Sequence, residues 1–129
     1  MNDITVKLWY RKADNDFKAG KDELATENPA TDTVCFHMQQ CVEKYLKAFL
    51  VHKGKEISKT HNLALLIQQC TEIDSSFQKL KEWNVAVLTA YAVGMRYPDD
   101  FYMPTNEESK QAVKTAEQVR AFVLSKVDF

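Results

Sequence analysis

The segment from Cys35 to Lys53 constrains the fold of this chain more than any other. Its apolar residues recur at intervals of three and four, the spacing that gathers side chains on one side of an α-helix. These residues are Cys35, Met38, Val42, Tyr45, Leu46, Phe49 and Leu50, and Cys41 and Ala48 widen the apolar arc beyond half of the circumference. One neighbouring helix cannot cover such an arc. We therefore predict a helix at the centre of a bundle that also meets a second copy of the chain.

Two polar residues fall inside or beside this apolar arc. Gln39 lies between Leu46 and Leu50 on the helical wheel, and Glu43 lies next to it. Buried amides and carboxylates are nearly always hydrogen-bonded. We therefore expect both side chains at the edge of buried surface, with partners supplied by the rest of the fold.

A first helix is predicted from about Asp3 to Thr26, because apolar residues repeat at three and four up to the break at Asn28-Pro29. Gly20 falls on its apolar stripe, where glycine costs about 1 kcal/mol of helix propensity relative to alanine. Close approach of another helix would offset that cost. The residues expected on the outer side are Lys7, Arg11, Asp14, Lys18 and Asp22.

Capping residues and glycine mark the next helix boundaries. Thr31 or Asp32 is the predicted N-cap of the central helix, and Gly54 is its predicted C-terminal stop. Thr60 is the predicted cap of a short third helix that runs to about Ile73.

A fourth and a fifth helix complete the predicted bundle. The fourth begins at Asp74, Ser75 or Ser76 and ends before Pro98, which cannot continue a helix. Its apolar stripe consists of Phe77, Leu80, Val87, Leu88, Tyr91 and Met95, with Asn84 in the middle. The fifth begins with a capping box formed by Thr105 and Glu108. Its inward residues are Ala112, Ala116, Val119, Val123 and Val127.

No segment alternates between apolar and polar residues over a useful length, so no sheet is expected. The pattern predicts an all-α fold, a five-helix bundle of the up-and-down type, formed by a single domain over residues 1–129.

The composition excludes several kinds of protein. Lys and Arg number 17 against 18 Asp and Glu, a formal net charge of −1, so the chain does not hold nucleic acid mainly by neutralising phosphates, and no DNA partner is expected. Three cysteines without a close C-x-x-C spacing indicate reduced thiols in the core. With no apolar leader and no run long enough to span a bilayer, we expect a cytoplasmic protein without membrane association.

Polar residues on the central helix are candidates for a binding site. His37, Cys41 and Lys44 fall on one side of this helix at spacings of four and three, next to Gln40. A solvated face is the plain interpretation, and a phosphate-binding surface is the functional one. Zinc takes three or four ligands, and His37 with Cys41 provides only two. We therefore predict no metal and no cofactor.

His61 and Arg96 offer two further groups that could bind phosphate. His61 follows the predicted cap of the third helix, where N–H groups and the helix dipole favour anions. Arg96 ends the fourth helix, where it either caps carbonyl groups or holds a phosphate with two hydrogen bonds. Tyr97 follows directly, and a base could stack on the aromatic residues there. No G-x-S-x-G turn, Walker loop or G-x-G-x-x-G motif occurs, which removes the common hydrolase, NTPase and dinucleotide interpretations.

Three blocks of the sequence match the pattern of a known family. The run Phe36-His37-Met38-Gln39-Gln40-Cys41-Val42-Glu43-Lys44-Tyr45-Leu46-Lys47-Ala48 is similar to an FHxQQxxEKxLKA signature. Thr60-His61-Asn62-Leu63 is similar to a T-H-(D/N)-L opening of a third helix, and Arg96-Tyr97-Pro98-Asp99 to an R-Y-P block after a fourth. In this order the blocks resemble the HEPN family of small helical domains, named for higher eukaryotes, prokaryotes and nucleotide binding. The resemblance covers nearly the whole chain.

The resemblance also implies a function. Catalytic members of the family are ribonucleases that use an Arg followed four to six residues later by a His, and here no Arg precedes a His at that interval. The chain resembles the shorter subgroup that works with a separately encoded small nucleotidyltransferase. By this resemblance we expect a dimeric, non-catalytic nucleotide-binding module, the toxin-like half of a two-gene pair.

The site residues expected for a nucleotide are His37, Gln40, Lys44, His61, Arg96 and Tyr97. Two alternatives remain open. One is a degenerate ribonuclease that assembles His37, His61 and Arg96 across a dimer cleft, and the other is a dimeric assembly domain without a small ligand.

Overall fold

The computed structural model describes residues 3–93 and 102–127. These residues form six α-helices and two 3-10 turns, and no strand occurs among them. The long helices are α1 (Asp3–Leu24), α2 (Thr31–His52), α3 (Leu63–Ile73) and α6 (Asn106–Leu124). Shorter elements lie between α3 and α6, namely η1 (Ser75–Phe77), α4 (Gln78–Glu82), η2 (Val85–Thr89) and α5 (Ala90–Val93). The all-α prediction is confirmed, and the predicted count of five helices is wrong.

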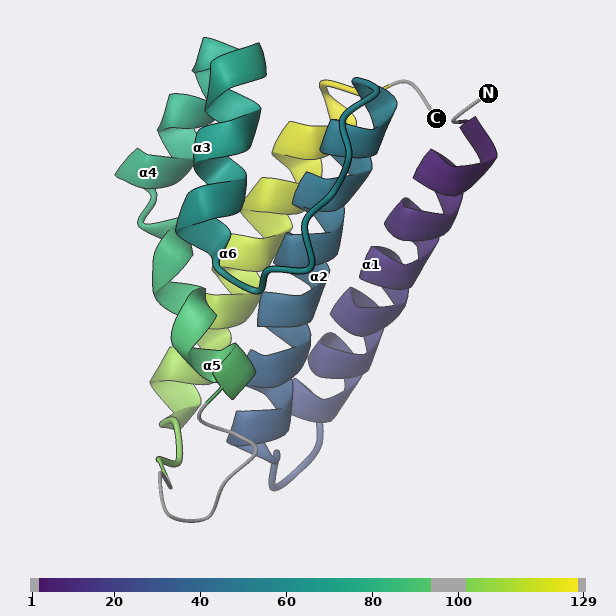
Figure 1. Cartoon of the computed structure of the whole chain (residues 1–129). Coiled ribbons are helices and arrows are strands. Elements are labelled where there is room, and N and C mark those ends of the chain that lie inside the picture. The colour runs from purple at the N-terminus through teal and green to yellow at the C-terminus, as the bar shows by residue number, and fades with distance from the viewer. Residues whose placement is uncertain (1–2, 94–101, 128–129) are drawn as a thin grey trace.

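The helices pack around α2, which lies in the middle of the bundle (Figure 1). Helix α1 runs antiparallel to α2 at one edge of the bundle, and this pairing is the most extensive in the molecule. After α2 the chain returns along this helix in residues 53–62, so that α3 then runs in the same direction as α2. Helices α6 and α5 and the turn η2 also contact α2.

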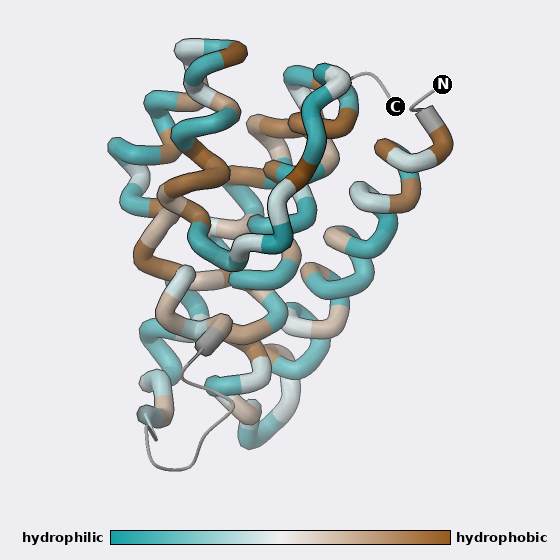
Figure 2. The backbone as a smooth tube through the Cα atoms, viewed as in Figure 1, coloured by the Kyte–Doolittle hydropathy of each residue, from teal (hydrophilic) through white to brown (hydrophobic). Residues whose placement is uncertain are grey.

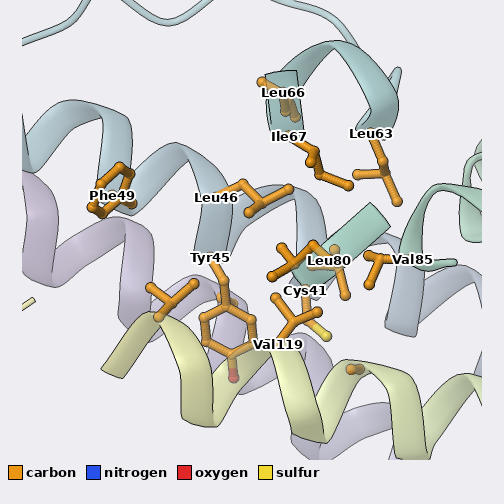
Figure 3. Close-up of a cluster of buried hydrophobic side chains, with 14 of the residues drawn as sticks. Cys41, Tyr45, Leu46, Phe49, Leu63, Leu66, Ile67, Leu80, Val85 and Val119 are labelled. Atoms are coloured by element: carbon orange, nitrogen blue, oxygen red, sulfur yellow. The ribbon is translucent and has the colours of Figure 1, made fainter. Parts of the chain in front are cut away.

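The wide apolar arc of α2 is covered within one chain. The side chains of Cys41, Tyr45, Leu46 and Phe49 are fully buried. Figure 3 shows them packed among residues of α3, α4, η2 and α6. The width of the arc therefore no longer argues for a second copy of the chain, although the homodimer itself stays a prediction.

Gly20 lies at a close contact between α1 and α2, as its place on the apolar stripe predicted. A Cβ atom at this position would lie 2.2 Å from the Met38 Cε atom and 3.4 Å from the Val34 carbonyl oxygen. Met38 is fully buried, so its methyl group has little room to withdraw. The glycine allows α1 to lie against α2 along its length.

The N-terminus of α2 differs from the prediction. The N-cap is Ala30, which provides no side-chain hydrogen bond, and the helix begins at Thr31. The Thr31 hydroxyl instead donates to the carbonyl oxygen of Pro104, at 2.6 Å, and the Ala30 N–H donates to Glu23. Neither Thr31 nor Asp32 is the cap, because tertiary contacts with the end of α1 and the start of α6 decide where α2 begins.

The C-terminus of α2 confirms the predicted stop. Gly54 has a φ of 75°. Its N–H donates to the Val51 carbonyl, and the N–H of Lys55 donates to the Leu50 carbonyl. This pattern is a Schellman motif, in which glycine takes the left-handed conformation at little cost.

Helix α3 is capped by Asn62 and not by Thr60. The Asn62 side chain accepts the Leu65 N–H, at 3.3 Å. The Thr60 hydroxyl accepts the N–H of Asn62 and so stabilises the turn before the helix. His61 therefore precedes α3. The expectation that its side chain lies in the first turn of this helix is wrong.

The predicted fourth helix is broken. Asp74 caps η1 by accepting the Ser76 N–H, which settles the choice among the three proposed caps. Asn84 has a φ of 57° and separates α4 from η2. Asparagine adopts the left-handed conformation more readily than most residues, and an exposed position here offers no packing to oppose it. Val87 was expected inward and is 59% exposed as a result, and Met95 lies outside the described residues.

The predicted capping box at the start of α6 is confirmed. Thr105 accepts the N–H of Glu108, and the Glu108 carboxylate accepts the N–H of Thr105. The residues expected to face inward, Ala112, Ala116, Val119, Val123 and Val127, are all buried.

A substitution at Asn84 tests the break in the fourth helix. We expect Asn84→Ala to lower the free energy of unfolding by about 1 kcal/mol, because alanine is penalised in the left-handed region. Asn84→Gly should leave it nearly unchanged. Urea denaturation measures both effects, with Gln78→Ala on the exposed side of α4 as the control. If Asn84→Ala instead stabilises the protein, the segment is a continuous helix, in which alanine is the better residue.

Candidate functional site

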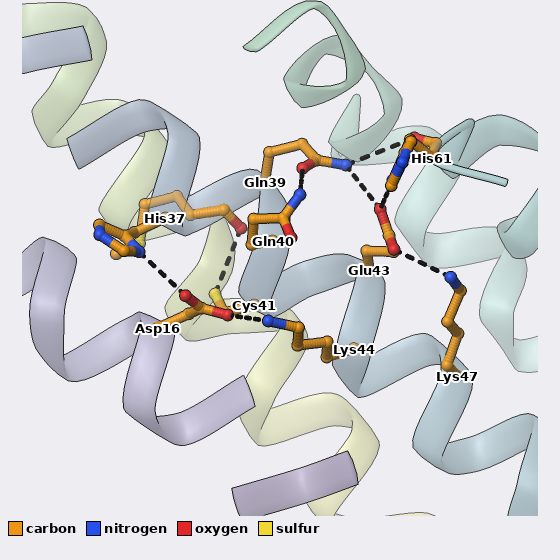
Figure 4. A network of polar contacts seen from close by, with 10 residues as sticks. Asp16, His37, Gln39, Gln40, Cys41, Glu43, Lys44, Lys47 and His61 are labelled. Atoms are coloured by element: carbon orange, nitrogen blue, oxygen red, sulfur yellow. Dashed lines mark hydrogen bonds and ion pairs between the residues drawn. The ribbon is translucent and has the colours of Figure 1, made fainter. Parts of the chain in front are cut away.

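Two groups of polar side chains lie along α2 on the side that faces α1 and the 53–62 segment (Figure 4). The Glu43 cluster consists of Gln39, Gln40, Glu43 and Lys47 of α2 and His61 of the returning segment. The Asp16 cluster consists of Asp16 of α1 with His37 and Lys44 of α2. The two clusters bring together every predicted site residue that the structure describes.

Glu43 is the centre of the first cluster. Its Oε2 atom lies 2.9 Å from Lys47 Nζ, and its Oε1 atom lies 2.9 Å from His61 Nδ1. Gln39 Nε2 donates to Glu43 Oε1 at 3.1 Å and to the His61 carbonyl oxygen at 3.3 Å. Gln39 and Glu43 therefore have the partners that their place on the helical wheel required, and these contacts hold the returning segment against α2.

The Glu43–Lys47 ion pair is buried. The Glu43 side chain is 5% exposed and the Lys47 side chain 6%. Burial favours the neutral acid, but hydrogen bonds from Lys47, His61 and Gln39 outweigh it, and the net effect lowers the pKa of Glu43. Because its pKa is lowered, the Glu43 carboxylate is ionised at neutral pH. The Lys47 ammonium also lies 5.7 Å from the ring centroid of Trp9 on α1, within the range of a cation–π contact.

Asp16 joins α1 to two predicted site residues of α2. Its carboxylate lies 2.9 Å from His37 Nδ1 and forms an ion pair with the ammonium group of Lys44. The Asp16 side chain is 15% exposed, and those of Lys44 and His37 are 23% and 27% exposed. The cluster therefore lies at the edge of the solvent.

Both histidines meet their carboxylates through Nδ1, and this orients both rings. A carboxylate accepts a hydrogen bond from Nδ1–H, so Nε2 accepts a hydrogen bond when the ring is neutral and donates one when it is charged. Neither Nε2 atom has a hydrogen-bond partner among residues 3–93 and 102–127. The His61 side chain is 48% exposed and that of His37 27%, so His61 is the more exposed of the two histidines.

The remaining predicted residues are placed as follows. Gln40 Nε2 donates to the Oε1 atom of Gln39 at 2.7 Å, which links it to the Glu43 cluster. Arg96 and Tyr97 lie outside the described residues. Cys41 was grouped with the polar side, but it is fully buried, its thiol points to the Met38 carbonyl oxygen, and burial raises its pKa. It is a core residue, as are Cys35 and Cys70.

Asp14 was expected on the outer side of α1 and instead lies partly buried between helices. Its carboxylate accepts hydrogen bonds from the Tyr45 hydroxyl and from Arg120 Nε, the latter at 2.9 Å. Sequence reasoning missed Asp14, Asp16 and Lys47. The helical wheel of α1 puts both aspartates at the borders of the apolar stripe, the position from which they reach α2 and α6.

Among the described residues, no three His, Cys, Asp or Glu side chains come together in a way that could hold a metal ion. No helix in the same residues is long and apolar enough to cross a membrane. What the site provides is two oriented imidazoles and two ammonium groups balanced by two carboxylates.

Comparison with known families agrees with the resemblance carried by the three sequence blocks. The sequence matches the HEPN domain family over residues 6–127. This chain belongs to the HEPN family. The prediction of the family is confirmed, and so is the HEPN-like class of the all-α fold.

The HEPN chain is also similar to individual proteins. It is 30% identical over 128 residues to a protein of Methanocaldococcus jannaschii named "Putative toxin MJ1304", an alignment that covers 88% of this chain and 82% of the relative.

Two solved structures share its fold. The crystal structure of TT1696 from Thermus thermophilus superposes with a TM-score of 0.82 at 25% identity, covering 98% of this chain and 100% of that one. ST0689, described as an archaeal HEPN homologue, superposes with a TM-score of 0.68 at 21% identity. The alignment covers 95% of this chain and 98% of the ST0689 chain. At that lower identity the likeness concerns the fold alone.

Glu43→Gln should destabilise this HEPN domain strongly. The amide keeps the shape of the side chain but leaves the buried Lys47 ammonium without a counter-charge, and breaking a buried ion pair costs about 3–5 kcal/mol. Adding Lys47→Met should recover part of this loss. Glu107→Gln is the control, because the Glu107–Lys110 pair is 3.6 Å long, its side chains are 86% and 62% exposed, and such pairs contribute about 0–1 kcal/mol. Urea denaturation that shows equal effects at Glu43 and Glu107 would contradict the role given to Glu43.

The lowered pKa of Glu43 also predicts how stability depends on pH. The folded state binds a proton at Glu43 less readily than the unfolded chain, whose carboxyl pKa is about 4.5. The contribution of Glu43 is therefore complete above this pH and is lost as pH falls through the lower folded pKa. We expect the difference in unfolding free energy between wild type and Glu43→Gln to narrow in that acid range. A difference that stays constant down to the acid transition would show that Glu43 is not the group that titrates.

Proposed function

We propose that this HEPN domain is a non-catalytic nucleotide-binding module that works with a separately encoded small nucleotidyltransferase, as the toxin-like half of a two-gene pair. The observation that carries the proposal is the pair of imidazoles, His37 and His61, which two carboxylates orient on one side of α2. Gln40 and Lys44 of α2 belong to the same proposed site, together with Arg96 and Tyr97.

The charges of the two clusters leave the imidazoles available to an anionic ligand. Asp16 and Glu43 are balanced by Lys44 and Lys47, so the paired charges of the two clusters cancel. With the carboxylate held at Nδ1, a phosphate oxygen can accept a hydrogen bond at Nε2 of a charged ring. A nucleotide phosphate therefore fits this arrangement.

The sequence supports a non-catalytic role. The arginines are Arg11, Arg96 and Arg120, and the histidines are His37, His52 and His61, so the Arg-to-His spacing of the catalytic HEPN ribonucleases does not occur. The toxin named among the relatives supports the assignment to a toxin-like half of a pair. A homodimer and a cytoplasmic location are parts of the same proposal.

A degenerate ribonuclease is the second candidate. A carboxylate that orients an imidazole through Nδ1 is also the arrangement by which a histidine is prepared as a general base. The His61–Glu43 pair has this geometry and its ring is half exposed. In that case His37, His61 and Arg96 would act on RNA in a cleft between two copies of the chain.

Thermal unfolding in the presence of nucleotides tests the proposal. At a hundredfold excess over Kd, a ligand of the folded state stabilises by about 2.7 kcal/mol, which raises the midpoint by several degrees for a domain of this size. We expect ATP, GTP or AMP to do this and sulfate at equal ionic strength to do less. The shift should be lost in His61→Ala and Arg96→Ala and retained in His52→Ala, because His52 is exposed at the end of α2.

Two outcomes would overturn this assignment. If no nucleotide exceeds sulfate, the chain is better described as an assembly domain without a small ligand. If the protein cleaves RNA, and His61→Ala abolishes cleavage while the domain stays folded, the ribonuclease is the better description.

A further inference from the structure

The first half of α1 presents exposed apolar and basic side chains together. Ile4 is 74% exposed and Leu8 is 55% exposed, high values for large apolar residues. Lys7, Arg11 and Lys12 are exposed on the same helix. At α-helical spacing, Ile4, Leu8 and Lys12 form one row, and Lys7 and Arg11 form the row beside it. We call these five residues the α1 outer face.

The positive charge of the α1 outer face has no counter-charge paired with it among residues 4–93 and 102–127. No acidic residue lies between Asp3 and Asp14 in the sequence. The two aspartates that follow are turned inward, where Asp14 binds Arg120 and Tyr45, and Asp16 binds His37 and Lys44. The three cations of the face form no ion pair with residues 4–93 or 102–127.

This arrangement carries a small cost in the isolated chain. Lys7 and Arg11 are like charges at a spacing of four on one helix, a combination that destabilises a helix slightly. Two large apolar side chains next to them stay mostly in water, so folding gives them little hydrophobic stabilisation. Both features would become favourable if a surface with carboxylates and apolar groups covered the face.

From this complementarity we infer that the α1 outer face binds a second protein through a surface that is acidic and partly apolar. The carboxylates of such a partner would meet Lys7, Arg11 and Lys12, and its apolar side chains would cover Ile4 and Leu8. A phosphate backbone would match the cations but would leave Ile4 and Leu8 exposed. This proposal does not depend on nucleotide binding at α2.

The α1 outer face does not complement itself. In a symmetric dimer each residue that touches a partner residue is touched by it in return. Pairing the first half of α1 with itself would bring Lys7 and Arg11 close to their own copies. A shifted pairing along the helix would offer them Asp22, which already forms a 2.7 Å ion pair with Lys18. A second copy that pairs α1 with α1 therefore does not cover the face, whereas an acidic and partly apolar surface does.

Synthetic helices provide a defined probe of the face. One peptide carries leucines along one side flanked by glutamates, and a matched peptide carries lysine in place of each glutamate. Titration followed by amide chemical shifts should show saturable binding of the glutamate peptide, with shifts concentrated in residues 4–12. The lysine peptide should show none. Phosphatidylserine vesicles and a single-stranded RNA are titrated in parallel to identify a membrane or nucleic-acid ligand.

Two variants separate binding from stability. Lys7→Glu should weaken binding of the glutamate peptide by about fivefold, since it removes one attraction and adds a repulsion. It should leave the unfolding midpoint unchanged or slightly raised, because it turns a like-charge pair with Arg11 into an attractive one. Lys110→Glu is the control: it makes the same change of charge at an exposed position of α6, where it also removes the 3.6 Å pair with Glu107, and it should not affect binding. Leu8→Ser should weaken binding through the lost apolar contact.

The proposal is overturned if the glutamate peptide binds no more tightly than the lysine peptide, or if Lys7→Glu and Lys110→Glu weaken it equally. It is also overturned if only vesicles or RNA bind to residues 4–12, since the ligand of the face is then a different class of molecule.

Discussion

The buried carboxylate of Glu43 is the constraint on which much of this structure depends. Helix α2 is enclosed by the rest of the bundle, so a charged side chain in its middle cannot be hydrated and needs partners from the protein. Lys47 neutralises it from the same helix, while His61 and the backbone beside it come from the returning segment. One buried charge thereby sets where residues 53–62 cross α2, and with it the point at which α3 begins.

Periodicity in the sequence was sufficient to predict what each long helix buries. The wheel of α2 predicted that Gln39 and Glu43 need partners, and the capping box of α6 was found at the expected residues. The break at Asn84 could not be read from that pattern, because the apolar spacing of the fourth helix continues across it. The predicted caps Thr31 and Thr60 were wrong for two different reasons. The Thr31 hydroxyl donates to Pro104, a contact that only the assembled fold creates, and the Thr60 hydroxyl accepts the N–H of Asn62 in a local turn before α3.

Only part of the candidate site could be predicted from the sequence. His37, Gln40, Lys44 and His61 could be named because they lie on or beside a recognisable motif, but their partner Asp16 comes from another helix. Asp14 and Asp16 of α1 are bound to side chains of α2 and α6 and are therefore not available to Lys7, Arg11 and Lys12. Near its start α1 also carries apolar segments on a largely hydrophilic helix (Figure 2). The inner network and the uncompensated outer face thus have a common origin.

The contact between Asp14 and Arg120 joins residues 106 positions apart. Helices α1 and α2 are neighbours in sequence and can pair soon after collapse, whereas α6 must close a loop of nearly the whole chain before Arg120 reaches Asp14. Until then Asp14 and Tyr45 can form their hydrogen bond, but the third side chain of this group, Arg120, is absent. Helix α6 therefore completes a polar contact begun by α1, which favours cooperative folding of the whole domain over a stable partly folded form.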